Sequence, residues 1–223
     1  EKKNDEDPIK AYTEEMHLGM WLTGKRVEGS WAHADEQSSF YELKAYVMNI
    51  FTRLGVNPGI VVTESSDNNV FGKALALKAR SGKVLCEMGI VSHQLLKKMD
   101  IEQEVFYADI NWDNMMRAIK KNEVLYHDIC KFPSVSRDLA LLLDKNVQFE
   151  QIEQIARQTE KKLLKSVELF DVYEGKNLPE GKKSYAVNFI LQDEARTLND
   201  KQIEAIMSKL INNLKTKLGA ELR

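Results

Sequence analysis

Residues 184–192 read Ser-Tyr-Ala-Val-Asn-Phe-Ile-Leu-Gln, and this stretch decides the fold of the second half of the chain. Large apolar side chains alternate with smaller or polar ones, which is typical of a strand with one buried face. The residues expected to face a core are Tyr185, Val187, Phe189 and Leu191. Those expected to face the other way are Ala186, Asn188, Ile190 and Gln192, either as contact residues or as a plain solvated surface.

The segments on either side of this strand supply the rest of one domain. They are predicted as a strand at 137–143, a helix whose apolar stripe runs from Phe149 to Leu163, a strand at 167–173, a helix over 203–218 and an edge strand at 220–223. The order is that of the βαββαβ unit, in which two helices cover one face of a four-stranded antiparallel sheet. We expect the other face to be open, and Phe170 and Tyr185 to belong to the core.

The first half of the chain predicts a second α+β domain. Apolar residues recur every three or four positions from Phe40 to Leu54, Ser39 and Glu42 form a capping box, and Gly55 suits a helix end. Strands are predicted at 18–24, 60–63, 74–79, 83–91 and 105–110, with a short helix at 112–119. Periodicity lapses over 122–133, so the predicted domains are 1–131 and 132–223.

Composition excludes several classes of protein. The chain has 223 residues and a net charge of −2, whereas a duplex-DNA-binding protein normally carries a basic surface. No apolar run could span a bilayer, and the chain opens on charged residues rather than on a signal peptide, so we expect no membrane contact and a cytoplasmic location. Cys86 and Cys130 are far apart and form no CxxC pair, which argues against a zinc site or a disulfide framework.

No catalytic motif is found along the chain. It contains no Walker phosphate loop, dinucleotide fingerprint, GxSxG elbow or HExxH run. The four histidines lack metal-ligand spacing, and Asp109 and Asp113 are interpreted as helix caps beside a strand. We therefore predict no catalytic residue and no metal ligand in this chain.

Five segments in order carry a family resemblance: 132–140 (Phe-Pro-Ser-Val-Ser-Arg-Asp-Leu-Ala), 168–175 (Glu-Leu-Phe-Asp-Val-Tyr-Glu-Gly), Lys183-Ser184, 196–198 (Arg-Thr-Leu) and 219–223 (Gly-Ala-Glu-Leu-Arg). Together they resemble the ferredoxin-fold anticodon-binding domain of bacterial phenylalanyl-tRNA synthetase beta subunits. Residues 18–24, 40–44 and 82–91 resemble the noncatalytic class II synthetase module of the same subunit. The resemblance implies an α+β chain with a partial antiparallel-sheet class II module followed by a ferredoxin-like domain.

The resemblance also implies a function. In this family an (αβ)2 enzyme joins phenylalanine to tRNA(Phe) with ATP and magnesium, and the alpha subunit holds the active site. The arginine-bearing motifs that grip ATP in class II enzymes are missing here, which fits a noncatalytic scaffold. The implied partners are the alpha subunit and tRNA(Phe), with no cofactor in this chain. The family's editing and magnesium-binding regions lie upstream, so none of their residues can be assigned.

We expect tRNA contacts at strand ends or on the expected open face, from Arg137, Lys183, Ser184, Asn188, Ile190 and Arg196. Each has a plain structural alternative. Arg137 could pair with Asp138, Ser184 could end a turn, and Arg196 could orient a cap formed by Thr197 and Asp200.

Two other functions are compatible with a ferredoxin-like fold, because fold alone does not set function. One is a free-standing regulatory module that binds a small molecule, and the other is a phosphatase of acyl phosphates. Both would need a specialised strand-to-helix loop, and residues 144–148 contain neither a glycine-rich run nor an Arg–Asn pair.

Overall fold

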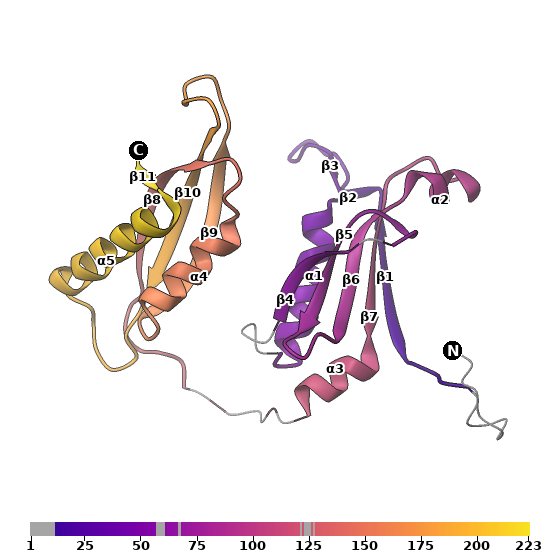
Figure 1. Ribbon diagram of the computed structural model, residues 1–223, viewed down its shortest axis with the longest axis horizontal. Helices are drawn as coiled ribbons and strands as arrows, with labels where there is room; N and C mark the ends of the chain where they lie inside the picture. Colours follow the sequence, from indigo (N-terminus) through magenta and orange to yellow (C-terminus); the bar gives the residue numbers. More distant parts are fainter. Residues whose placement is uncertain (1–11, 57–60, 67, 121, 123–125, 127) are drawn as a thin grey trace. The chain divides into compact units, whose positions relative to one another are not determined.

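A computed structural model describes residues 12–56, 61–66, 68–120, 122, 126 and 128–223 (Figure 1). The chain divides into two compact units, Glu1–Tyr126 and His127–Arg223, and each is described by itself. The two units meet between Tyr126 and His127, slightly before the domain boundary that the sequence predicts after Lys131. The predicted boundary stays a prediction. No helix within the described ranges is long and apolar enough to cross a membrane.

The N-terminal unit is built on a five-stranded sheet in the order β1-β7-β6-β5-β4. All of its neighbouring strands run antiparallel. The strands are β1 (His17–Thr23), β4 (Val61–Ser66), β5 (Phe71–Ala79), β6 (Val84–Val91) and β7 (Val105–Asn111). The other elements are the small pair β2 (Lys25–Val27) and β3 (Glu36–Gln37), and the helices α1 (Phe40–Arg53), α2 (His93–Lys98) and α3 (Trp112–Ile119).

Helix α1 forms over the predicted residues, but only the Ser39 half of the predicted capping box is present, since the Glu42 carboxylate accepts from the Tyr46 hydroxyl at 2.9 Å. The Ser39 hydroxyl accepts a hydrogen bond from the Glu42 amide at 3.3 Å, and Gly55 takes the left-handed conformation (φ +71°) just after the helix. Leu43, Val47 and Phe51 are buried against one face of the sheet, where they meet apolar residues of β6 and β7. The predicted α1 and the predicted β5–β6 hairpin are both confirmed.

The C-terminal unit is a four-stranded antiparallel sheet in the order β11-β8-β10-β9, with both helices on one face (Figure 1). Its strands are β8 (Val135–Asp144), β9 (Leu164–Tyr173), β10 (Lys182–Leu191) and β11 (Glu221–Leu222). The helices are α4 (Phe149–Thr159) and α5 (Asp200–Leu218). The predicted βαββαβ order and α+β class are confirmed.

Strand β10 is the centre of this unit, between β8 and β9. Its alternation is confirmed, because Tyr185, Val187, Phe189 and Leu191 are all buried against α4 and α5. The residues between them lie on the face without helices. The sheet therefore has one apolar and one open side, as expected for an antiparallel sheet covered on a single face.

The prediction that Phe170 belongs to the core is wrong, because Val167 and Leu169 face the helices and the alternation of the strand turns Phe170 away from them; β9 also contains a bulge at that position. Val187 pairs with Leu169 and Ala186 pairs with Asp171, which leaves Phe170 as an extra residue between two pairs. Its side chain is 60% exposed. The companion prediction that Tyr185 belongs to the core is confirmed.

Candidate nucleic-acid interface

The side of the C-terminal sheet without helices, here called the open face, is defined by strand register. Residues that pair directly across antiparallel strands point to the same side of the sheet. Asn188 on β10 pairs with Asp138 on β8 and Glu168 on β9. The open face therefore comprises Ser136, Asp138, Ala140, Leu142, Asp144, Ser166, Glu168, Asp171, Tyr173, Lys182, Ser184, Ala186, Asn188, Ile190 and Glu221, with Lys182 and Asp144 paired as a salt bridge at its end.

The middle of the open face is polar and acidic. The Asn188 side-chain amide donates to Asp138 Oδ1 at 2.5 Å and also to the Ser136 hydroxyl. Within β9, the Ser166 hydroxyl donates to Glu168 Oε1 at 3.1 Å. These carboxylates repel phosphate groups but can accept hydrogen bonds from the amino groups of nucleic-acid bases.

One end of the open face carries an aromatic ring and a cation. Tyr173 is 36% exposed, and its ring lies so close to Gly175 that a Cβ atom there would come within 2.1 Å of it. The Arg223 guanidinium lies 5.4 Å from the ring centroid, and Tyr173 pairs with the buried Ser184 on β10. Gly175 thus leaves room for the ring, and Arg223 lies over it.

Three of the six predicted contact residues, Ser184, Asn188 and Ile190, lie on the open face. Lys183 instead shares the helix-covered side with Tyr185, is only 7% exposed, and places its ammonium 4.5 Å from the Tyr185 ring centroid. Arg137 pairs with Phe189 and also lies on that side, where its guanidinium donates to the Ser136 carbonyl at 2.9 Å. Of the three predicted cations, Arg137 and Lys183 thus lie on the side of the sheet opposite Asn188.

Arg196 lies in the loop after β10, with its Nε 3.4 Å from the Asp193 carboxylate. The cap of α5 expected from Thr197 and Asp200 is formed by other residues. Asn199 Oδ1 caps the helix by accepting from the Gln202 backbone N–H at 2.9 Å, and Gln202 Oε1 completes the capping box by accepting from the Asn199 backbone N–H at 3.3 Å.

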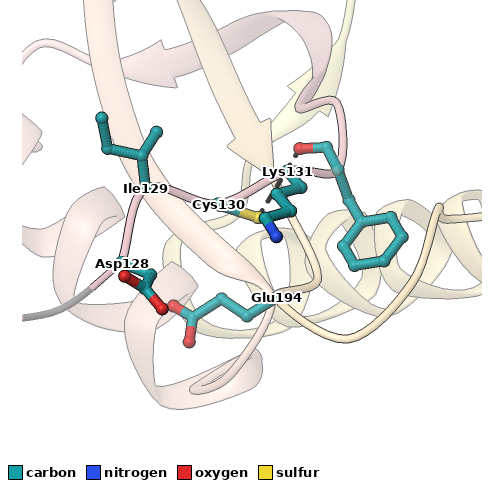
Figure 2. A pocket seen from close by; sticks show the side chains of 6 residues that line it. Asp128, Ile129, Cys130, Lys131 and Glu194 are labelled. Carbon is teal, nitrogen blue, oxygen red and sulfur yellow. Dashed lines mark hydrogen bonds between the residues drawn. The ribbon is translucent and has the colours of Figure 1, made fainter.

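A cleft of about 480 Å³ lies near this loop and is bordered by Asp128, Ile129, Cys130, Lys131, Phe132 and Glu194 (Figure 2). The Cys130 thiol donates weakly to the carbonyls of Phe132 and Asp193, each at 3.6 Å. Glu194 accepts from Lys165 at 2.5 Å, so acidic and basic groups are mixed here. The cleft consequently presents no uniform charge to a nucleic acid.

The N-terminal unit contains a titratable cluster that sequence reasoning missed. His17 Nδ1 lies 2.8 Å from Asp109 Oδ1, and its Nε2 lies 3.5 Å from Glu15. The hydrogen bond and charge of Asp109, assisted by Glu15, raise the pKa of His17 above its usual value despite some desolvation. No group of three or more metal-ligating side chains occurs in the part of the chain that the structure describes.

Neither Asp109 nor Asp113 has the capping role expected of it. Asn111 caps α3 by accepting from the Asn114 amide at 2.8 Å. Asp109 binds His17, and Asp113 accepts from the Met16 amide at 3.2 Å. Each aspartate thus ties β7 or α3 to the segment that contains β1.

Two family models match the chain. Residues 2–112 match the "Phenylalanyl tRNA synthetase beta chain CLM domain", and residues 130–223 match the "Ferredoxin-fold anticodon binding domain". The second match contains the open face, and the first contains the five-stranded sheet up to α3.

Several curated phenylalanine–tRNA ligase beta subunits are similar to the chain. The protein from Bacteroides fragilis is 58% identical over 223 residues, which is all of this chain and 27% of that protein. The Porphyromonas gingivalis protein is 51% identical over 222 residues, again all of this chain and 27% of the relative. The Clostridium acetobutylicum protein is 35% identical over 186 residues, 82% of this chain and 23% of the relative. The chain thus spans about a quarter of these relatives and belongs to the phenylalanyl-tRNA synthetase beta-chain family.

Proposed function

We propose that the chain is a noncatalytic part of a phenylalanine–tRNA ligase beta subunit, and that its open face contacts the anticodon region of tRNA(Phe). The observation that supports this most is the end of the open face, where Tyr173 and Asp171 follow one another on the same side of β9 and the Arg223 guanidinium lies over the Tyr173 ring. It combines a stacking ring, a carboxylate acceptor and a cation, the groups that recognise unpaired bases.

The charge on the open face favours contact with bases over contact with the backbone. Asp138, Glu168 and Asp171 all lie on it, and like charges repel at short range. An unstacked base carries no formal charge, and its amino groups can donate to carboxylates. The bases of the loop would therefore lie against the sheet, with the phosphates turned away from it.

The six contacts expected from the sequence remain proposals, and they differ in whether the residue lies on the open face. Ser184, Asn188 and Ile190 lie on the proposed face. Arg137, Lys183 and Arg196 lie outside it, and any contact with tRNA would use another surface. The structure adds Asp171, Tyr173 and Arg223 to the candidates.

In the whole enzyme we propose the (αβ)2 arrangement, with ATP, magnesium and the chemistry held by the alpha subunit. No residue of this chain is assigned to catalysis. The N-terminal unit would then act as a scaffold for the alpha subunit, and the enzyme would work in the cytoplasm. Since beta-subunit relatives match both halves of the chain together, a free-standing regulatory module is the poorer explanation.

The proposal is tested by Tyr173→Ala in the complete (αβ)2 enzyme. Loss of one stacked base costs about 1–3 kcal/mol, so the Kd for tRNA(Phe) should rise roughly 5- to 150-fold. Tyr173→Phe should bind nearly as the parent does, because it keeps the ring. Phenylalanine-dependent ATP–pyrophosphate exchange should not change, since that step needs no tRNA.

Tyr46→Ala is the matched control, because Tyr46 is an exposed tyrosine of α1 in the N-terminal unit. The loss of tRNA affinity caused by Tyr173→Ala should also be smaller for a tRNA(Phe) whose anticodon nucleotides lack their bases. If Tyr173→Ala binds tRNA(Phe) as tightly as Tyr46→Ala does, the open face is not the contact surface.

A further inference from the structure

The N-terminal sheet carries a row of aromatic rings on the side away from α1. Trp21 on β1 stacks with Tyr107 on β7 at 4.9 Å between centroids, and Tyr107 stacks with Phe71 on β5 at 5.8 Å. Tyr107 pairs with Gly89 on the intervening strand β6. Because Gly89 has no side chain, the rings of β7 and β5 can meet across β6.

The exposed end of this row lies beside a carboxylate. A Cβ atom on Gly19 would come within 2.5 Å of the six-membered ring of Trp21, so the indole lies over Gly19. Gly19 pairs directly with Asp109, and directly paired residues have Cβ atoms about 5 Å apart. The indole, which is 68% exposed, therefore lies next to the Asp109 carboxylate.

Other acidic groups extend this negative region. Asp109 pairs with Glu87 on β6, so the two carboxylates share a side of the sheet. Glu15 lies within 3.5 Å of His17, which contacts Asp109 on its other ring nitrogen. An exposed aromatic face beside several carboxylates attracts cations and repels phosphate.

The geometry favours a planar cation. A guanidinium can stack flat on the Trp21 indole while its edge donates to the Asp109 oxygen that His17 does not contact, whereas an ammonium can do only one of these well. We propose that Trp21 and Asp109 form a docking point for an arginine side chain of a partner protein. The charge complementarity of this surface selects a protein with a basic group over an RNA.

The test is an NMR titration of the full 223-residue chain with N-acetyl-arginine amide, which carries the side chain without backbone charges. The Trp21 indole N–H signal should shift saturably in the millimolar range. Asp109→Asn should weaken binding about tenfold or more, because a charge-assisted hydrogen bond becomes a neutral one. Glu64→Gln is the control, since Glu64 lies on the same side of the sheet but pairs with Lys78 at 2.6 Å.

Two further ligands define the chemistry. N-acetyl-citrulline amide has the same shape without the charge and should not bind, and N-acetyl-lysine amide should bind more weakly. Trp21→Leu, followed through the Gly19 amide signal, should lose binding while the rest of the spectrum keeps its folded dispersion. The proposal is overturned by equal affinity for citrulline or lysine, by unchanged affinity in Asp109→Asn, or by tighter binding of a single-stranded RNA at Trp21.

Discussion

Phe189→Ala is the substitution that most directly tests whether the two units have separate cores. Phe189 is 0% exposed and lies in the middle of β10, paired with Arg137 on β8 and Val167 on β9. Each hydrophobic cluster is drawn from one unit alone, residues 20–119 in the N-terminal unit and 135–220 in the C-terminal unit. Removing the ring should therefore destabilise the C-terminal unit and leave the N-terminal unit unchanged.

The size of the effect follows from burial. Truncating a fully buried phenylalanine to alanine costs about 3–5 kcal/mol, including the cavity that remains. If the free energy of unfolding falls by about 2 kcal/mol for each molar of urea, the unfolding midpoint of the C-terminal unit should fall by about 2 M. Phe170→Ala is the matched control, because Phe170 lies exposed in the bulge of the neighbouring strand. Its unfolding free energy should change by no more than about 0.5 kcal/mol.

The tryptophans allow the two units to be followed separately. All three, Trp21, Trp31 and Trp112, lie in the N-terminal unit. Their fluorescence reports that unit, while far-UV circular dichroism reports both. In Phe189→Ala the dichroism should gain an early transition that the fluorescence does not follow. If the fluorescence midpoint falls by the same 2 M or so, the two units unfold as one and the reasoning from separate cores is wrong.

Two titratable groups give further predictions. Burial, with the nearby Asp109 and Glu87 charges, raises the pKa of Cys86 to about 12, so iodoacetamide at pH 8 should label Cys130 and spare Cys86 until the chain is unfolded, as mass spectrometry can show. The raised pKa of His17 means that its stabilising contribution is fully present below about pH 6.5 and is lost as pH rises through the folded pKa. Its imidazole NMR titration should have a midpoint above 6.5 that moves down in Asp109→Asn; an unmoved midpoint would show that Asp109 is not the cause.

Local patterns in the sequence were sufficient for much of the fold. The period-two pattern of β10 and the three-four spacing of α1 identify buried faces without any long-range information. The same alternation places Lys183 on the side of Tyr185, and Arg137 on the side of Leu139 and Leu141. Their position away from the open face could therefore be predicted from the sequence. Both residues were expected as contacts because they lie at strand ends, a criterion that does not depend on which face of the sheet a side chain occupies.

The cluster of His17, Asp109 and Glu15 could not be predicted from such local patterns. His17 and Asp109 are separated by 92 positions, and they meet because β1 pairs with β7 in one particular register. A shift of one residue would have moved His17 to the other face of the sheet. The spacing of the histidines in the sequence does not indicate that register, so the cluster is seen only in the folded chain.

The bulge in β9 shows how one local irregularity creates the proposed interface. Val167 and Leu169 face the helices, so strict alternation would turn Asp171 and Tyr173 toward the helices as well. The extra residue at Phe170 reverses the side of every residue after it, and Asp171 and Tyr173 therefore pair on the open face with Ala186 and Ser184. If β9 had no bulge, the same residues could form the same strands and helices, but Asp171 and Tyr173 would face the helices. The open face would then lack the ring and the carboxylate on which the proposed base contact depends.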